Sequence, residues 1–299
     1  MEVLRISNLH KRFGEKEVLK GLNLVVPEHS IFGFIGKNGA GKTTAMKTVL
    51  GLLKAEEGEI EVLGERVTYG QTSTNRHIGY LPDVPEYYGF MTAREYLNFC
   101  GEIVSIGRED REARSQEMLE LVGLANEKGR IKGYSRGMKQ RLGVAQALLN
   151  RPKLLICDEP TSALDPIGRK EILDLFLAVR EHTTVLFSTH ILSDIERVCT
   201  DVAFLNDGKI CLSGNISEVK SRYKVDRFLL KMERAEDCLI LEENFDGVKK
   251  IAEDTLVFRQ EGVEVFKLLS FIASNKLSIL KIEKEQPTLE SAFLEVIEK

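Results

Sequence analysis

A glycine-rich segment, Gly36-Lys37-Asn38-Gly39-Ala40-Gly41-Lys42-Thr43-Thr44, places the strongest constraint on how this chain can fold. The short apolar run 31–35 precedes it, and apolar residues at helical spacing follow it between residues 45 and 53. Glycines let backbone N–H groups approach an anion, and the N-terminal end of the following helix adds a positive dipole. The sequence therefore predicts a strand, a phosphate-binding loop and a helix, in that order.

The residues in this loop also indicate which phosphate compound it binds. They match the pattern GxxxxGK[ST], in which the lysine bridges the β- and γ-phosphates of a nucleoside triphosphate and the hydroxyl binds Mg²⁺. We therefore expect Lys42 to contact the phosphates and Thr43 to be a metal ligand. The predicted nucleotide-binding residues of the loop are Gly36, Asn38, Gly39, Ala40, Gly41, Lys42, Thr43 and Thr44.

A second motif supplies carboxylates. The apolar run 154–157 ends in Asp158 and Glu159. In isolation, such a run is often just a strand that ends at the surface. Beside a phosphate loop, the same pattern predicts that Asp158 lies near the metal, as in the Walker B motif, and that Glu159 polarises an attacking water.

Composition limits the classes of protein to which the chain can belong. The longest strictly apolar run, 175–179, has five residues, whereas a membrane-spanning helix needs about 20. The five cysteines are scattered without a CxxC pair, which suits a reducing cytosol and predicts neither a disulfide framework nor a zinc site. The net charge of −4 lacks the basic excess of nucleic-acid-binding proteins, so we expect no nucleic-acid partner.

Charge is distributed unevenly along the 299 residues. Residues 226–299 contain 11 Lys and Arg against 16 Asp and Glu, while the preceding residues contain 31 against 30. Only two of the 24 glycines lie in that last quarter. The change predicts a domain boundary near residues 215–226, although a single domain with an acidic end would have the same composition.

The two parts differ in their predicted elements. Before the boundary, strand and helix patterns alternate, which predicts an α/β core with a mostly parallel sheet. After it, we expect strands at 228–231, 239–241 and 256–259, and helices at 263–275 and 289–298.

The segment Tyr134-Ser135-Arg136-Gly137-Met138-Lys139-Gln140 resembles the LSGGQ signature of the ATP-binding cassette (ABC) of ABC transporters. Ser135 and Gly137 match this signature, whereas Arg136 and Met138 depart from it. The variant is similar to that of the branch that exports drugs, antibiotics and peptides. In isolation, Ser135 would be interpreted as a simple helix N-cap. The order of all the motifs makes the resemblance specific over roughly residues 2–220.

Other positions match the same family. The resemblance implies that Phe13 stacks on adenine, although a core phenylalanine is the alternative. It also implies that Asp165 belongs to a D-loop at a dimer interface and that His190 is the switch histidine at the γ-phosphate. Asp83 lies at the Q-loop position, where most members have Gln and many exporters of this branch have Glu. We expect Asp83 to face Mg²⁺ or its water, with a shorter reach.

The resemblance implies a fold and a division into domains. The expected fold class is α/β: a P-loop NTPase (RecA-like) core with an antiparallel β subdomain and a helical signature subdomain at about 84–150, plus a small C-terminal α+β domain. The expected domains are an ABC ATP-binding domain at 1–222 and an accessory domain at 223–299. The segment 287–294 is similar to the tail of cassettes in the same branch.

The resemblance also implies an activity and partners. We expect an ATPase that uses ATP and Mg²⁺, with Lys42, Glu159 and His190 as catalytic residues. A second copy or a related ABC subunit would complete a head-to-tail dimer. The chain would lie in the cytoplasm, peripheral on the cytoplasmic face of the cell membrane, and would power a separate transmembrane permease that exports drugs, antibiotics or peptides.

Three alternatives stay open at this point. ABC proteins that act in translation usually carry two cassettes and basic extensions, whereas this chain has one cassette and an acidic tail. Repair-type ABC ATPases contain long coiled coils, and no sustained heptads occur here. A regulatory module would bind nucleotide without turnover, but the chain retains Lys42, Asp158, Glu159 and His190.

Overall fold

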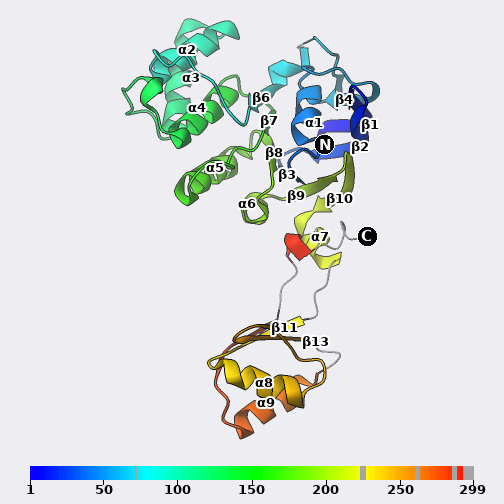
Figure 1. The fold of residues 1–299 in the computed structure, drawn as a ribbon. Helices are drawn as coiled ribbons and strands as arrows, with labels where there is room; N and C mark the ends of the chain where they lie inside the picture. Colours follow the sequence, from blue (N-terminus) through cyan, green and yellow to red (C-terminus); the bar gives the residue numbers. More distant parts are fainter. Residues whose placement is uncertain (72, 223–226, 260–262, 285–287, 292–299) are drawn as a thin grey trace. The chain divides into compact units, whose positions relative to one another are not determined.

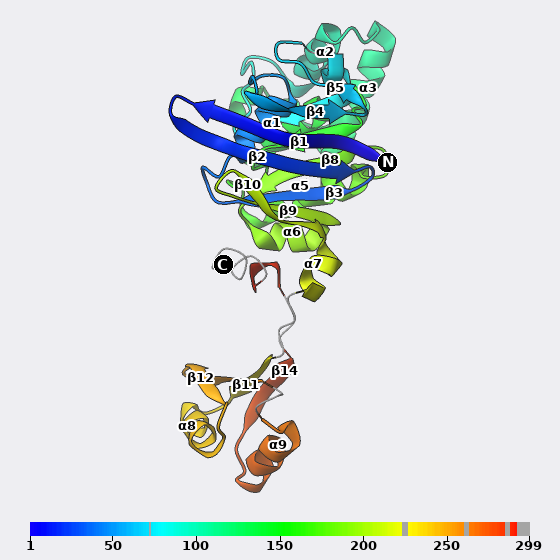
Figure 2. The same cartoon turned by 90° about the vertical axis from the view of Figure 1, so that its right-hand side faces the viewer.

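A computed structural model describes residues 1–71, 73–222, 227–259, 263–284 and 288–291 of the chain (Figures 1 and 2). Contacts divide the chain into two compact units, one comprising Met1–Ile216 and a second that begins at Ser217. This division falls at the start of helix α7 (Ile216–Arg222). The composition indicates a boundary near 215–226, and the expected domains 1–222 and 223–299 divide at the end of this helix. Each unit has a buried core of its own.

A six-stranded sheet forms the centre of the first unit. All of its neighbouring strands are parallel except the antiparallel pair at one edge, so the prediction of an α/β fold is confirmed. In sheet order the strands are β10 (Lys209–Asn215), β9 (Asp201–Asn206), β3 (Ile31–Gly36), β8 (Thr184–Thr189), β7 (Leu154–Cys157) and β6 (Ile78–Leu81). β3, β7 and β8 are buried along their whole length, as expected for central parallel strands.

A four-stranded antiparallel sheet covers one side of this core. Its order is β2 (Lys16–Pro27), β1 (Glu2–Phe13), β4 (Glu57–Val62) and β5 (Glu65–Arg66). One hydrophobic cluster joins β1, β2 and β4 to helix α1 (Lys42–Val49) and to the strands of the large sheet. Figure 2 shows β1 and β2 crossing in front of β3 and β8. The phosphate loop therefore leads into a helix that is held between two sheets.

Three helices gather beyond β6 (Figure 1): α2 (Ala93–Ile103), α3 (Arg108–Leu121) and α4 (Arg136–Leu148). Thr92 and Glu95 form a capping box at the start of α2, which fixes where that helix begins. Helices α5 (Pro166–Val179) and α6 (Leu192–Val198) follow β7 and β8, and the short 3₁₀ helices are η1 (Ser73–His77) and η2 (Ile131–Gly133). In the part of the chain that the structure describes, no helix is both long and apolar enough to cross a bilayer.

The second unit is a small α+β sandwich with the order β–α–β–β–α–β, as the predicted fold class required. Its antiparallel sheet has the order β12 (Lys249–Ala252), β13 (Thr255–Arg259), β11 (Arg227–Met232) and β14 (Ile279–Lys284). Helices α8 (Ala235–Asn244) and α9 (Val265–Ser274) pack on one face of the sheet through a shared apolar cluster. Most of the helix expected at 289–298, and residues 287 and 292–294 of the tail motif, lie outside the described residues.

The prediction of a strand at 239–241 is wrong, because this segment lies inside α8. Three consecutive apolar residues suggested a buried strand, but the helix buries Cys238 and Leu241, three residues apart, and exposes Leu239 and Ile240. The spacing of the buried positions, not the apolar run, determined the element.

This helical register predicts different effects for two neighbouring leucines. Leu241→Ala removes a fully buried side chain and should cost about 2 to 5 kcal/mol of unfolding free energy. Leu239→Ala, at a position that is 51% exposed, should change it by less than about 0.5 kcal/mol. Amide hydrogen exchange of Ala235–Asn244 in the full chain measures the stability of the helix in both variants. Equal loss of protection in the two variants would contradict the helix.

Candidate functional site

The sequence-predicted residues meet at one edge of the large sheet. The glycine-rich loop follows β3, Asp158 and Glu159 follow β7, and His190 follows β8. Because these three strands are parallel neighbours, their carboxyl ends lie together. Ligands of open α/β sheets bind at this edge.

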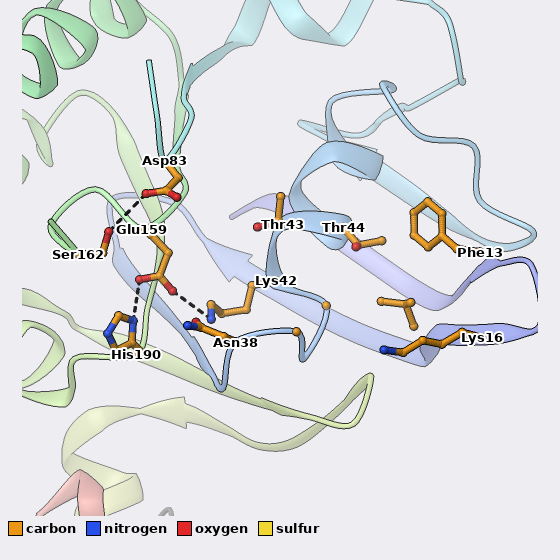
Figure 3. A pocket seen from close by; sticks show the side chains of 13 residues that line it. Phe13, Lys16, Asn38, Lys42, Thr43, Thr44, Asp83, Glu159, Ser162 and His190 are labelled. Carbon is orange, nitrogen blue, oxygen red and sulfur yellow. Dashed lines mark hydrogen bonds and ion pairs between the residues drawn. The ribbon is translucent and has the colours of Figure 1, made fainter. Parts of the chain in front are cut away.

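A cavity of about 610 Å³ opens at this edge (Figure 3). Its volume is in the range of small-molecule sites. Figure 3 shows Phe13 and Lys16 at one end, Asp83, Glu159 and His190 at the other, and Lys42 between them. The lining residues are Phe13, Lys16, Val18, Asn38, Gly39, Gly41, Lys42, Thr43, Thr44, Asp83, Glu159, Ser162 and His190.

The backbone of the loop requires glycine at its ends. Gly41, which precedes α1, has φ = 113°, and a Cβ atom there would lie 2.8 Å from Leu19 Cδ2. A Cβ atom on Gly36 would lie 2.7 Å from the carbonyl oxygen of Leu205. The loop can therefore take this path between β3 and α1 only with these two glycines.

Lys42 is held in place from both sides. Its Nζ atom donates to the carbonyl oxygen of Gly36 at 2.7 Å and forms an ion pair with Glu159 Oε1 at 3.0 Å. The side chain is only 6% exposed. An ammonium group that is buried in this way needs a negative partner, and the carboxylate of Glu159 provides it.

Glu159 lies at the centre of the charged end of the cavity. Its second carboxylate oxygen, Oε2, is 2.9 Å from Nδ1 of His190. Its backbone has φ = +46°, a left-handed conformation that costs a non-glycine residue roughly 1 to 2 kcal/mol. Strain of this kind persists where the surroundings impose it, and it clusters at functional sites.

Asp158 links the three strand ends. Its Oδ2 accepts a hydrogen bond from Thr43 Oγ1 at 2.6 Å, and its Oδ1 accepts one from Ser188 Oγ at 2.6 Å. Ser188 Oγ also accepts from the backbone N–H of Glu159 at 2.9 Å. Ser188 thus fixes the orientation of Asp158 and the strained backbone of Glu159 at the same time.

Asp83 reaches the cavity from the loop after β6. Its Oδ1 accepts a hydrogen bond from Ser162 Oγ at 3.3 Å (Figure 3). Tyr80 lies in β6, three residues before Asp83, and burial, together with the negative charge of Asp158, raises the pKa of its phenol to about 12. Tyr80 therefore stays neutral beside the carboxylates at physiological pH.

Phe13 forms the opposite end of the cavity. It is 50% exposed, which excludes the alternative of a core phenylalanine. The Nζ atom of Lys11 lies 5.1 Å from the centre of its ring. A half-exposed ring on the wall of a cavity can stack on a flat ligand.

Six predicted residues do not line the cavity: Asp158, whose contacts are described above, and five others. Gly36 contributes only its carbonyl oxygen to Lys42, and Ala40 packs on the core. Ser135 caps α4 by accepting from the N–H of Met138, with Gly137 in the first turn. Asp165 caps α5 by accepting from the N–H of Gly168. The signature and D-loop residues thus lie at the starts of two helices.

Three polar residues that help to form the site were not predicted from the sequence. Lys16 lines the cavity because it pairs with Phe13 in the hairpin of β1 and β2, and no motif marks it. Ser162 lies three residues before Asp165 of the D-loop, and it also lines the cavity. Ser188 precedes His190 by two residues, which was the only available signal.

Comparisons with known proteins agree with this arrangement. The family model described as "ABC transporter" matches residues 19–162. An uncharacterized ABC transporter ATP-binding protein, YxlF of Bacillus subtilis, is 39% identical over 99% of both chains. The bacitracin transport ATP-binding protein BcrA of Bacillus licheniformis is 35% identical over 99% of this chain and 97% of its own. A solved structure of an ATP-binding subunit of an ABC transporter superposes with a TM-score of 0.67 at 28% identity, covering 74% of this chain and 93% of the other.

The chain belongs to the ATP-binding proteins of ABC transporters. It is therefore an ABC ATPase, and its first unit has the P-loop NTPase fold. ATP-binding subunits of ABC transporters dimerise and work with membrane permease components. The translation and repair alternatives are not favoured by these relatives.

The double role of Ser188 gives a testable prediction for this ABC ATPase. Ser188→Ala removes both hydrogen bonds and should lower kcat about 10-fold, because Asp158 and Glu159 lose their fixed positions. Ser30→Ala is a matched control: it also removes a buried hydroxyl, one that donates to Pro27 before β3, away from the cavity. Steady-state ATPase assays compare them. Equal rates in the two variants would show that Ser188 does not position the site.

Proposed function

We propose that this ABC ATPase hydrolyses ATP at the cavity between β3, β7 and β8, with Glu159 as the residue that orients and deprotonates the attacking water. The observation that carries the proposal is the position of the Glu159 carboxylate, within 3.0 Å of Lys42 and 2.9 Å of His190. A carboxylate between a lysine and a histidine, beside a phosphate loop, suits the positioning of a water for phosphoryl transfer.

The other residues of the cavity have complementary roles in this proposal. The N–H groups of the loop and Lys42 hold the phosphates, and Lys42 and His190 stabilise the charge that develops on the γ-phosphate. Phosphates in the cavity compete with Glu159 for Lys42, so nucleotide binding frees the carboxylate for the water. Phe13, at the far end, stacks on the adenine.

The residues present also fit Mg²⁺. Thr43 and Asp158 bring a hydroxyl and a carboxylate together at 2.6 Å, and Asp83 adds a second carboxylate on the cavity wall. Within the described ranges, no group of three His, Cys, Asp or Glu side chains could hold a metal alone. Mg²⁺ in nucleotide sites is held by one or two protein carboxylates together with the phosphates, which this donor set allows. When bound, the ion neutralises phosphate charge.

A second copy or a related subunit completes the site in this proposal. Ser135 and Gly137, at the N-terminal end of α4, do not line the cavity of their own chain. A helix N-terminus binds anions, so these residues would contact the phosphates held by Lys42 of the partner in a head-to-tail dimer. Asp165 would lie at that interface. ATP would then favour the closed dimer, and its hydrolysis would let the dimer open.

Replacement of the proposed base tests the catalytic assignment. Glu159→Gln should bind ATP, hydrolyse it at least about 100-fold more slowly, and accumulate as an ATP-bound dimer, because the base is lost while the phosphate contacts remain. ATPase assays and size-exclusion chromatography with ATP measure both effects.

Glu181→Gln, at an exposed position after α5, is the matched control and should behave as the unmodified protein. A normal turnover rate in Glu159→Gln would refute the role of Glu159.

We also propose where the permease binds. Tyr88 and Phe90 are exposed on the loop that precedes α2. Tyr88 contacts the rings of Phe90 at 5.9 Å and Phe99 at 5.7 Å. The neighbouring Tyr87 is instead partly buried, and its hydroxyl donates to the carbonyl oxygen of Lys139 in α4. An exposed aromatic cluster anchored to the signature helix suits a partner helix.

Charged residues in this cluster should uncouple the permease. Tyr88→Glu together with Phe90→Glu should reduce transport and co-purification with the permease at least about 10-fold, while basal ATPase activity stays within about two-fold. Tyr69→Glu, at a similarly exposed tyrosine of the first unit, should have no effect. Full transport by the double variant would refute the docking site.

The names of two relatives support a proposal for the class of cargo. Two proteins that match this chain over 99% of its length, from Bacillus licheniformis and Enterococcus faecalis, are named bacitracin transport ATP-binding proteins. We therefore propose that this chain powers export of an antibiotic, drug or peptide through a separate permease. It would act at the cytoplasmic face of the cell membrane. Residues 1–222 would be the ATP-binding domain and 223–299 the accessory domain.

A further inference from the structure

A buried ion pair lies next to the cavity but outside it. Asp194, in the first turn of α6, is only 4% exposed. Its Oδ1 accepts a hydrogen bond from Arg169 Nη2 at 2.6 Å, and its Oδ2 accepts one from Thr161 Oγ1 at 2.7 Å. A buried carboxylate is costly unless it is fully paired, so these contacts hold all three side chains in one arrangement.

The three residues come from the segments that carry the proposed catalytic groups. Thr161 lies two residues after Glu159, and Asp194 lies four residues after His190. Arg169 is in the first turn of α5, just after the D-loop segment. The segment after β7 and the segment after β8 are therefore joined twice: at Glu159 and His190, and again at Asp194.

Short backbone hydrogen bonds connect the two junctions. The N–H of Ser162 donates to the carbonyl oxygen of Glu159 at 3.2 Å, and the N–H of Asp194 donates to that of Ile191, the residue after His190, also at 3.2 Å. A shift of Thr161 would therefore move Glu159 through the turn between them, and a shift of Asp194 would move His190 in the same way.

We propose that Arg169, Thr161 and Asp194 are positioning residues for ATP hydrolysis, acting through the contact between Glu159 and His190. This inference rests on the proposed roles of those two residues. It predicts an effect on the chemical step rather than on ATP binding. The phosphate loop follows a different strand, β3, and takes no part in the hydrogen bonds of Asp194.

The same two helices offer a matched control. Arg197 in α6 and Asp174 in α5 also form an ion pair, at 3.2 Å, but both side chains are substantially exposed. Solvent-exposed ion pairs contribute little to folding stability. Removing this pair disturbs the contact between α5 and α6 without disturbing the buried junction beside Glu159.

The experiment measures steady-state ATP hydrolysis by the full-length chain. Asp194→Asn, Arg169→Met and Thr161→Val should each lower kcat about 10-fold with the KM for ATP unchanged within about two-fold, because small misplacements of catalytic groups cost rate rather than binding. Asp174→Asn and Arg197→Met should keep the normal kcat. Thr161→Ser, which retains the hydroxyl, should restore most of it.

Different variants test the positioning role of these three residues and the catalytic role of Glu159. Should Asp194→Asn fail to fold, Arg169→Met and Thr161→Val carry the test. If their kcat values match those of the two exposed-pair variants, or if only KM changes, the inference is overturned. Normal turnover by Glu159→Gln would instead overturn the proposed function.

Discussion

The carboxylate of Asp158 is the contact on which the geometry of the site depends. It receives hydrogen bonds from Thr43, after β3, and from Ser188, at the end of β8, while its own residue follows β7. Three neighbouring strand ends are therefore fixed to one another. Glu159 and His190 come directly after two of them, so their contact is a consequence of this junction. The buried Asp194 joins the segments after β7 and β8 a second time, through Thr161 and Arg169.

Much of this site could be predicted from the sequence because its residues come in short motifs. The glycines, Lys42 and Thr43 are adjacent in the chain, and a loop that turns from a strand into a helix needs them in that order. Asp158 and Glu159 end an apolar run, and parallel strands bring their carboxyl ends to one edge. Local spacing was thus enough to predict that Lys42 and Glu159 belong to one site, whereas His190 was expected there only because of the family resemblance.

Contacts between distant segments could not be predicted. Ser188 and Lys16 acquire their positions from strand pairing, and the partners of Asp194 come from two different segments. In the second unit, the net charge of the segment does not indicate the charge of each face of its sheet. Although residues 226–299 are acidic, the sheet face opposite the helices carries Lys231, Lys249, Arg259 and Lys281 beside the acidic Glu283, because side chains alternate between the two faces of a strand. The buried spacing in α8 was likewise hidden by an apolar run.

The central claim is that Glu159 and His190 act as one unit at the γ-phosphate. A double-mutant cycle of Glu159→Gln and His190→Ala, measured by single-turnover ATP hydrolysis, tests it most directly. Because the two side chains are 2.9 Å apart, the double variant should hydrolyse ATP about as slowly as the slower single variant. Fully additive losses in activation free energy would contradict the account.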